Sequence, residues 1–165
     1  MENFDFPEPS LLDTLVAAYL RYNNIFYPLL HGPTLLGAVG SKLYKRDSSF
    51  ARVLLLVCAL GARAIDDPRT VLPGQPLRAA GWRWFNQVRI TRPVIMQSPR
   101  LDDIQLYCLG AMFCAQSHLS LAWLLIGLGL RMLHDVGAHR KHIYCATPNV
   151  QEELWKRCFW FVCSR

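Results

Sequence analysis

The residues best suited to chemistry in this 165-residue chain are histidines and cysteines near its C-terminal end. His139, His142 and Cys145 have the spacing H-x2-H-x2-C, with His134 close by. Imidazole and thiolate groups at short spacing can hold zinc, but a structural zinc needs four ligands, usually in two close pairs. No second pair is evident, so the spacing favours a polar loop after a helix. The sequence therefore predicts no metal-binding residue and no cofactor in this chain.

The six cysteines are expected to be reduced thiols packed in the core. They match no zinc or redox spacing, and most lie in apolar helical runs, where cysteine packs as a small hydrophobic residue. The N-terminal segment MENFDFPEPS is acidic and has no apolar core, so it predicts no signal peptide and favours an intracellular compartment. The cysteines are Cys58, Cys108, Cys114, Cys145, Cys158 and Cys163.

The sequence contains none of the familiar catalytic motifs. There is no G-x-S-x-G, no P-loop and no Rossmann glycine pattern. A Cys-His dyad stays open, because its partners meet only in the folded chain. Apolar surroundings, however, raise the pKa of a thiol and lower its reactivity. We predict no catalytic residue and interpret the chain as something other than an enzyme.

The positive charge of the chain is unevenly distributed. The net charge is +6, and six arginines but no acidic residue lie between Arg69 and Arg100. Such a patch can attract nucleic acid, yet this amount of charge is also ordinary for solubility, which we favour. Tryptophan and phenylalanine recur at helical spacing, which favours core packing over stacking on bases. The sequence predicts no DNA-binding residue.

The long apolar stretch of residues 102–137 is predicted to be the centre of the fold. It has no charged residue from Ile104 to Leu130, and a polar break at residues 116–118 divides it into two segments of helix length. We expect an antiparallel helix pair whose second helix is buried nearly all round. A membrane span is the alternative, but the uninterrupted apolar part, residues 119–130, is shorter than the roughly 20 residues that a span needs.

The two ends of this stretch have the residues that helix ends favour. Asp102 and Asp103 place negative charge at a helix N-terminus, and Gly137 stands where a left-handed C-cap belongs. Asp135 is the exception, because it places a carboxylate against the helix dipole in the last turn. We therefore expect Asp135 to be less exposed than a typical acid and to lie within about 4 Å of an arginine, with Arg131 as first candidate.

The rest of the chain shows helical apolar spacing without strict alternation, which predicts an all-α fold of about seven helices. We expect residues 1–9 to be loose and residues 10–165 to form one helical domain. The expected N-caps are serine or threonine residues just before apolar runs. Further helices are predicted over residues 11–24, from Pro33, over 48–65 and 77–92, and from about Pro148, with N-caps at Ser10, Ser48 or Ser49, and Thr147.

A series of short segments in a fixed order carries the strongest indication of function. Together they resemble the fungal-specific transcription factor domain, the regulatory middle region of fungal zinc-cluster transcription factors, over roughly residues 19–165. The segments are Tyr27–Thr34, Val57–Arg63, Asp66–Arg69, Gly81–Phe85, Leu106–Leu109, Trp123–Gly127, Arg131–Arg140 and Glu153–Trp160.

This resemblance implies an all-helical domain, a nuclear location, a role in regulating transcription and no catalysis. In such proteins DNA contact belongs to a separate six-cysteine zinc cluster with a C-x2-C-x6-C half-site. That spacing does not occur here, so neither zinc nor base contacts are carried onto this chain. The residues that we assign as a structural signature, with no catalytic, metal-binding or DNA-binding role, are Arg131, Asp135, Gly137, His139 and Trp155.

The partners implied by the resemblance are the rest of the same transcription factor, a second copy of the chain, DNA through a missing domain, and a small-molecule effector. Zinc is expected only in the absent DNA-binding cluster, and no membrane partner is expected. Two other classes of protein stay open from the residues alone. One is a helical enzyme with a pocket between helices, and the other is a membrane-associated helical protein.

The last helix is predicted to need a further layer of protein. Residues 158–163 are all apolar and cover every face of nearly two helical turns. One face can pack on the central pair, and we expect the other to form an exposed apolar patch. Domains of this family normally continue well beyond this point, so the chain is expected to be incomplete at its C-terminus.

Overall fold

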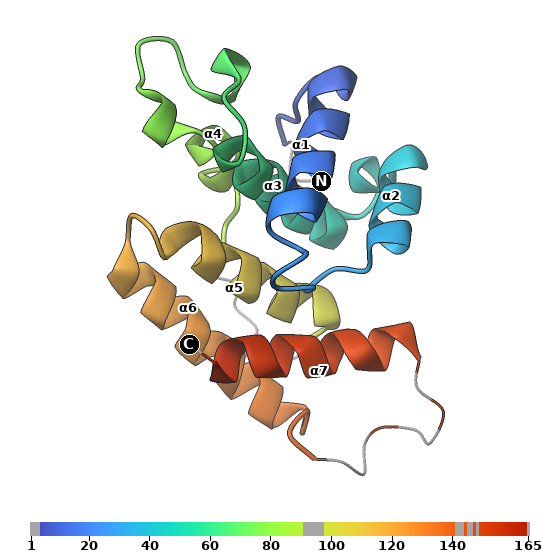
Figure 1. Cartoon of the computed structure of the whole chain (residues 1–165). Helices are drawn as coiled ribbons and strands as arrows, with labels where there is room; N and C mark the ends of the chain where they lie inside the picture. The colour runs from blue at the N-terminus through green and yellow to red at the C-terminus, as the bar shows by residue number, and fades with distance from the viewer. Residues whose placement is uncertain (1–3, 91–97, 141–143, 145–146, 148, 165) are drawn as a thin grey trace. The chain divides into compact units, whose positions relative to one another are not determined.

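The computed structural model of the chain describes residues 4–90, 98–140, 144, 147 and 149–164. Within these residues the chain forms seven α-helices, three short 3-10 helices and no strand (Figure 1). The all-α fold predicted from the helical spacing is confirmed. The α-helices are α1 (Pro9–Tyr22), α2 (Gly32–Gly40), α3 (Ser48–Arg63), α4 (Trp82–Phe85), α5 (Leu101–Cys114), α6 (Leu119–Asp135) and α7 (Val150–Cys163).

The helices form two compact units. The first contains Met1–Phe26 and Gly32–Arg89, and the second contains Tyr27–His31 and Ile90–Arg165. The segment 27–31 therefore belongs to the second unit, although the rest of that unit begins only at Ile90. The predicted limits of the domain, residues 10–165, stay a prediction.

Helix α3 is the centre of the first unit. All its residues from Ser49 to Ala62 except Phe50 are buried, as its apolar sequence predicts. Helices α1 and α4 both pack against it (Figure 1). At Gly61 the backbone of α1 comes so near that a Cβ atom would overlap the carbonyl oxygen of Leu15. Only glycine fits at this position, because the neighbouring atoms belong to the backbone and cannot rotate away.

The predicted N-caps of the first unit were wrong by one or two residues. Asp47, not Ser48 or Ser49, caps α3, since its carboxylate accepts hydrogen bonds from the N–H groups of Ser49 and Phe50. Helix α1 begins at Pro9, so Ser10 lies inside its first turn. An aspartate before two serines can take the capping position itself, because its short acidic side chain reaches the same N–H groups.

The single helix predicted over residues 77–92 was also wrong. The chain forms a 3-10 helix at Leu77–Ala79 and then the four-residue α4, while the predicted end lies outside the described residues. Gly81 separates the two with a φ of 84°, a left-handed conformation that interrupts a right-handed helix. Trp84 is fully buried. The apolar residues at helical spacing in this region therefore anchor a short helical turn and do not form the stripe of a longer helix.

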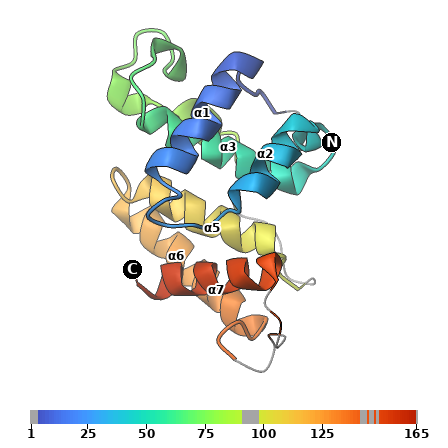
Figure 2. The same ribbon diagram turned by 45° about the vertical axis from the view of Figure 1, so that its right-hand side comes forward.

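In the second unit α5 and α6 form the predicted hairpin, joined by a turn in which Cys114 O accepts hydrogen bonds from the N–H groups of Ser117 and His118. Helix α7 packs on both (Figures 1 and 2). The prediction that the second helix of the pair is buried nearly all round was wrong. In α6 only Ala122, Leu125, Gly129 and Leu133 are buried.

The more buried partner of the hairpin is α5, in which only Leu101, Asp102 and Met112 are not buried. The uncharged composition is shared by both helices and could not distinguish them. Among the described residues no helix combines the length and apolar character needed to cross a membrane.

The start of α7 differs from the prediction as well. Asn149 is its N-cap, because the Asn149 side chain accepts a hydrogen bond of 2.8 Å from the Glu152 N–H group. Thr147 is therefore not the cap, and Pro148 lies outside the described residues. Glu152 and Glu153 lie in the first turn as expected. The buried face of α7 consists of Leu154, Cys158, Phe161 and Val162.

Candidate functional site

The C-terminal end of α6 is a structured helix stop. Gly137 has a φ of 74°, its N–H group bonds to the His134 carbonyl, and the Ala138 N–H group bonds to the Leu133 carbonyl. These two bonds form a Schellman motif, in which a left-handed residue satisfies the last free carbonyls of a helix. The C-cap predicted at Gly137 is confirmed.

Arg131 and Asp135 form the expected pair one turn before this stop. The Arg131 Nε atom lies 3.8 Å from Asp135 Oδ1. The predicted low exposure of Asp135 was wrong, because its side chain is 58% exposed. Both residues lie on the outer face of α6, where solvent screening limits such a pair to about 0–1 kcal/mol. The pair therefore offsets the unfavourable interaction of the Asp135 carboxylate with the helix dipole, but it contributes little to the stability of the fold.

His139 lies just beyond the helix stop and packs beside His134, with ring centroids 4.9 Å apart in an edge-to-face arrangement. The Arg140 Nε–H group donates to His139 Nε2 over 3.3 Å. His134 also lies edge-on to Phe159 of α7. These contacts bring the start of the loop back toward α7.

The candidate zinc spacing is only partly visible, because His142 and Cys145 lie outside the described residues. The part of the chain that the structure describes contains no group of three or more His, Cys, Asp or Glu side chains placed to hold a metal.

Tyr144 contacts Ala138, which follows α6, and Lys156 of α7. Its hydroxyl donates a 2.6 Å hydrogen bond to the Ala138 carbonyl, and the Lys156 ammonium lies 4.8 Å from the centre of its ring. Trp155 of the predicted signature is half-buried beside Lys156 in α7. The charged side of α7 is organised by Glu153, which pairs with Arg157 and more distantly with Lys156.

A buried glutamine that was not predicted from the sequence holds segment 27–31. Gln105 is buried in α5, and its amide donates a 2.8 Å hydrogen bond to the Leu29 carbonyl. Arg157 donates to the Pro28 carbonyl, and the Tyr27 ring lies edge-on to Phe161. A lone glutamine inside an apolar run was the available signal, because a buried amide needs a partner.

Of the five cysteines that the structure describes, four follow the core prediction, whereas Cys145 lies outside the described residues. Cys58, Cys108, Cys114 and Cys158 are buried, whereas Cys163 at the end of α7 is exposed. Burial raises the pKa of the Cys58 thiol far above its ordinary value. The pKa of Cys108 is also raised, mainly by burial and then by its hydrogen bond with Cys158. Protonated thiols without access to solvent are poor nucleophiles, which argues against a role for either group in catalysis.

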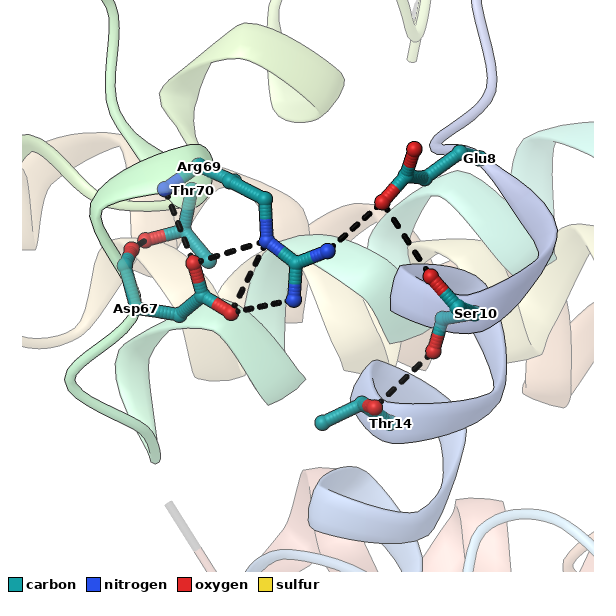
Figure 3. Close-up of polar contacts among 6 residues, drawn as sticks. All are labelled: Glu8, Ser10, Thr14, Asp67, Arg69 and Thr70. Carbon is teal, nitrogen blue, oxygen red and sulfur yellow. Dashed lines mark hydrogen bonds and ion pairs between the residues drawn. The ribbon is translucent and has the colours of Figure 1, made fainter.

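Three described arginines of the arginine-rich segment, Arg69, Arg83 and Arg100, pair with carboxylates within the chain. Arg69 lies between two carboxylates, 2.7 Å from Asp67 and 2.6 Å from Glu8 (Figure 3). The hydrogen bond with Arg69 is the main cause that holds the pKa of Asp67 below its usual range. Arg83 pairs with Asp5 in the same unit. These pairs tie the N-terminal segment to residues 67–87 and reduce the charge available to a phosphate.

Comparison with known proteins assigns this set of helices to a family. Residues 16–162 match the family model described as the fungal specific transcription factor domain. The chain belongs to this family, as the resemblance predicted, and the family is one of transcription regulators. No solved structure matches the chain.

Three similar proteins carry names of the same class. The chain is 25% identical over 176 residues to the acetamidase regulatory protein of Emericella nidulans, covering 98% of this chain and 20% of that protein. It is 27% identical over 154 residues to transcription factor opdR of Penicillium oxalicum, covering 90% and 19%. It is 22% identical over 157 residues to cutinase transcription factor 1 beta of Fusarium vanettenii, covering 93% and 18%. The chain thus spans about a fifth of the length of the curated relatives it matches.

Proposed function

We propose that this chain is the regulatory region of a fungal zinc-cluster transcription factor, that it acts in the nucleus, and that it carries no catalytic activity. In this proposal a separate segment with a six-cysteine zinc cluster contacts DNA. The chain here controls transcription through contacts with the rest of the regulator. The observation that supports this most is the family match over residues 16–162, which spans both compact units. A second copy and a small-molecule effector stay predicted partners.

The arrangement of charge supports a separate DNA-binding segment. Proteins that bind DNA sequence-specifically place base-contacting side chains in a groove of the duplex. They also contact the phosphates with several unpaired lysine or arginine side chains. In this chain Arg69, Arg83 and Arg100 each pair with a carboxylate. The remaining positive charge is suited to weak attraction without sequence preference.

A reporter experiment tests the regulatory role. The 165-residue chain is fused to a heterologous DNA-binding domain whose site drives a reporter gene in a fungal host. We expect reporter transcription to change relative to the DNA-binding domain alone. The matched control is Leu133→Asp, which places a charge on the buried face of α6 and should abolish the change in reporter transcription. An unchanged reporter with normal accumulation of the fusion would contradict the proposal.

A binding experiment tests the assignment of DNA contact to another segment. The purified chain is offered random duplexes at physiological salt, and bound sequences are counted. We expect no enriched sequence, and a weak affinity that falls steeply as salt is added, because only phosphate attraction is available. Reproducible enrichment of one motif by this chain alone would overturn the assignment.

A further inference from the structure

Arg52 of α3 is a buried cation that forms no ion pair within the described residues. The residue is only 6% exposed. Its Nε–H group donates to the Ser48 carbonyl over 3.2 Å, and an Nη2–H group donates to the Ser49 hydroxyl over 3.4 Å. A buried charge is unfavourable unless a counter-charge lies beside it. An anion at the start of α3 would therefore stabilise Arg52.

The part of the Arg52 guanidinium that has no hydrogen bond remains in contact with solvent. A guanidinium has five N–H donors, and two of those in Arg52 have partners. Within the described residues, the one fully buried side-chain nitrogen without a hydrogen-bond partner belongs to Trp84. The Nη1 group of Arg52, which has no partner there, is therefore accessible to solvent. Because the Nε bond holds the guanidinium at the Ser48 carbonyl, these free donors lie at the first turn of α3.

Ser48 is placed to carry the missing negative charge. It is exposed and is the first residue of α3. Arg52 follows four residues later, and an acidic group pairs best with a basic group at this spacing when the acid comes first. A phosphate on Ser48 would also lie at the positive end of the helix dipole. The adjacent Asp47 carboxylate opposes it, but the exposed Lys45 and Arg46 supply two positive charges nearby.

The residues before Ser48 form a pattern that a protein kinase can recognise. Lys45 and Arg46 stand three and two residues before the serine. Kinases distinguish their substrates partly by such charge patterns, because an acidic surface beside the active site binds the basic residues. Ser10 is the natural comparison. It is also exposed and lies in the first turn of α1, but Glu8 and Pro9 precede it.

We propose that Ser48 is phosphorylated by a protein kinase selective for basic residues, and that its phosphate pairs with Arg52. In this reaction Ser48 Oγ attacks the γ-phosphorus of ATP and forms an O–P bond. The bond from that phosphorus to the bridging oxygen breaks, ADP leaves, and the hydroxyl proton passes to the base of the kinase. The phosphate carries a charge of about −1.5 to −2, so it supplies the counter-charge that Arg52 lacks and holds the start of α3.

Incubation of the folded 165-residue chain with the catalytic subunit of cyclic-AMP-dependent protein kinase and magnesium ATP tests the modification. Mass spectrometry maps the phosphate, which we expect at Ser48 and not at Ser10. Arg46→Gln should slow the transfer about tenfold, because the kinase loses one of its two cationic contacts. Arg78→Gln is the matched control, since it changes an exposed arginine elsewhere in the same unit, and it should leave the rate unchanged.

Thermal melting of the phosphorylated and unphosphorylated chain tests the pairing with Arg52. We expect the phosphate to raise the melting temperature by about 2–4 °C. In Arg52→Gln the phosphate should give no increase, whereas in Arg78→Gln the increase should persist. Each variant is compared with its own unphosphorylated form, so any loss of stability from the substitution itself cancels. Phosphorus NMR titration of the unsubstituted phosphoprotein gives a second readout, because pairing lowers the second pKa of the phosphate below its usual value of about 6.

Three results would overturn the proposal: no phosphate at Ser48, transfer to Ser10 as fast as to Ser48, or an equal rise in melting temperature with Arg52→Gln. The reporter assay uses the unphosphorylated chain and measures transcription. It is independent of these measurements, so the regulatory role and the phosphorylation can fail separately.

Discussion

At the scale of single residues, glycines and charged side chains decide how the helices meet. Gly61 lets α1 approach α3 to backbone contact, and Gly137 ends α6 in a left-handed turn. Arg69 connects two carboxylates from separate segments of the first unit. Each position depends on one residue type, so each can be tested by a single substitution.

Gly61→Ala is expected to destabilise the fold by about 1–3 kcal/mol, because the added methyl group overlaps the Leu15 carbonyl and α1 must shift. Gly37→Ala in the same unit is the control. No atom lies within 4 Å of its added Cβ, so it should stabilise the chain by about 0.5–1 kcal/mol. Urea unfolding of both variants measures the difference, and equal midpoints would show that the close approach does not exist.

Asp67 should titrate at lower pH than an ordinary aspartate, because the hydrogen bond with Arg69 favours its charged form. A carboxyl whose pKa is lowered on folding stabilises the protein above its unfolded pKa, about 3.9, and loses that contribution as pH falls through the folded value. Carbon-detected NMR titration reports the pKa directly. Arg69→Gln should return it toward the ordinary value, while Arg78→Gln should not change it.

At the scale of elements, short polar side chains set the helix limits and apolar spacing sets their packing. Asp47 and Asn149 cap α3 and α7, in both cases in place of the residue that the sequence pattern favoured. The apolar stripes predicted the existence of these helices well. Their first residues depended on which of several adjacent cap formers reached the free N–H groups.

Asp47→Ala should cost about 0.5–2 kcal/mol, because two N–H groups at the start of α3 lose their acceptor. Ser48→Ala is the matched control, since the Ser48 side chain does not serve as the cap. Its effect should stay within about 0.5 kcal/mol. Thermal melting followed by circular dichroism separates the two. A larger loss of stability from Ser48→Ala than from Asp47→Ala would support Ser48 as the N-cap, as predicted from the sequence.

At the scale of the whole molecule, the chain consists of two helical units with separate centres, α3 in one and the α5–α6 hairpin with α7 in the other. Four cysteines distributed over both centres are buried, and Cys163 is exposed. Thiol reactivity therefore reports on the integrity of each unit at once.

Among the five cysteines that the structure describes, alkylation under native conditions, mapped by mass spectrometry, should modify Cys163 first. Cys58 and Cys108 should react only as their units open, because both thiols are buried and protonated. Adding denaturant below the unfolding midpoint should accelerate the buried sites and leave the rate at Cys163 nearly unchanged. Alkylation of Cys58 as fast as Cys163 in native buffer would mean that the first unit is not packed as described.

The sequence by itself determined the helical class, the hairpin at residues 102–137, the stop at Gly137, the Arg131–Asp135 pairing and the family. These depend on local periodicity, on the backbone requirements of single residues and on neighbours one turn apart, all of which can be identified from the local sequence.

Tertiary structure alone decided which hairpin helix is buried, that Gln105 holds segment 27–31, and that Leu119 and Trp123 face solvent. Helices α5 and α6 have similar uncharged compositions, so composition could not tell them apart. Burial depends on contacts between residues far apart in sequence, and the same apolar residue can serve a core or an interface. That choice is made only when the helices pack.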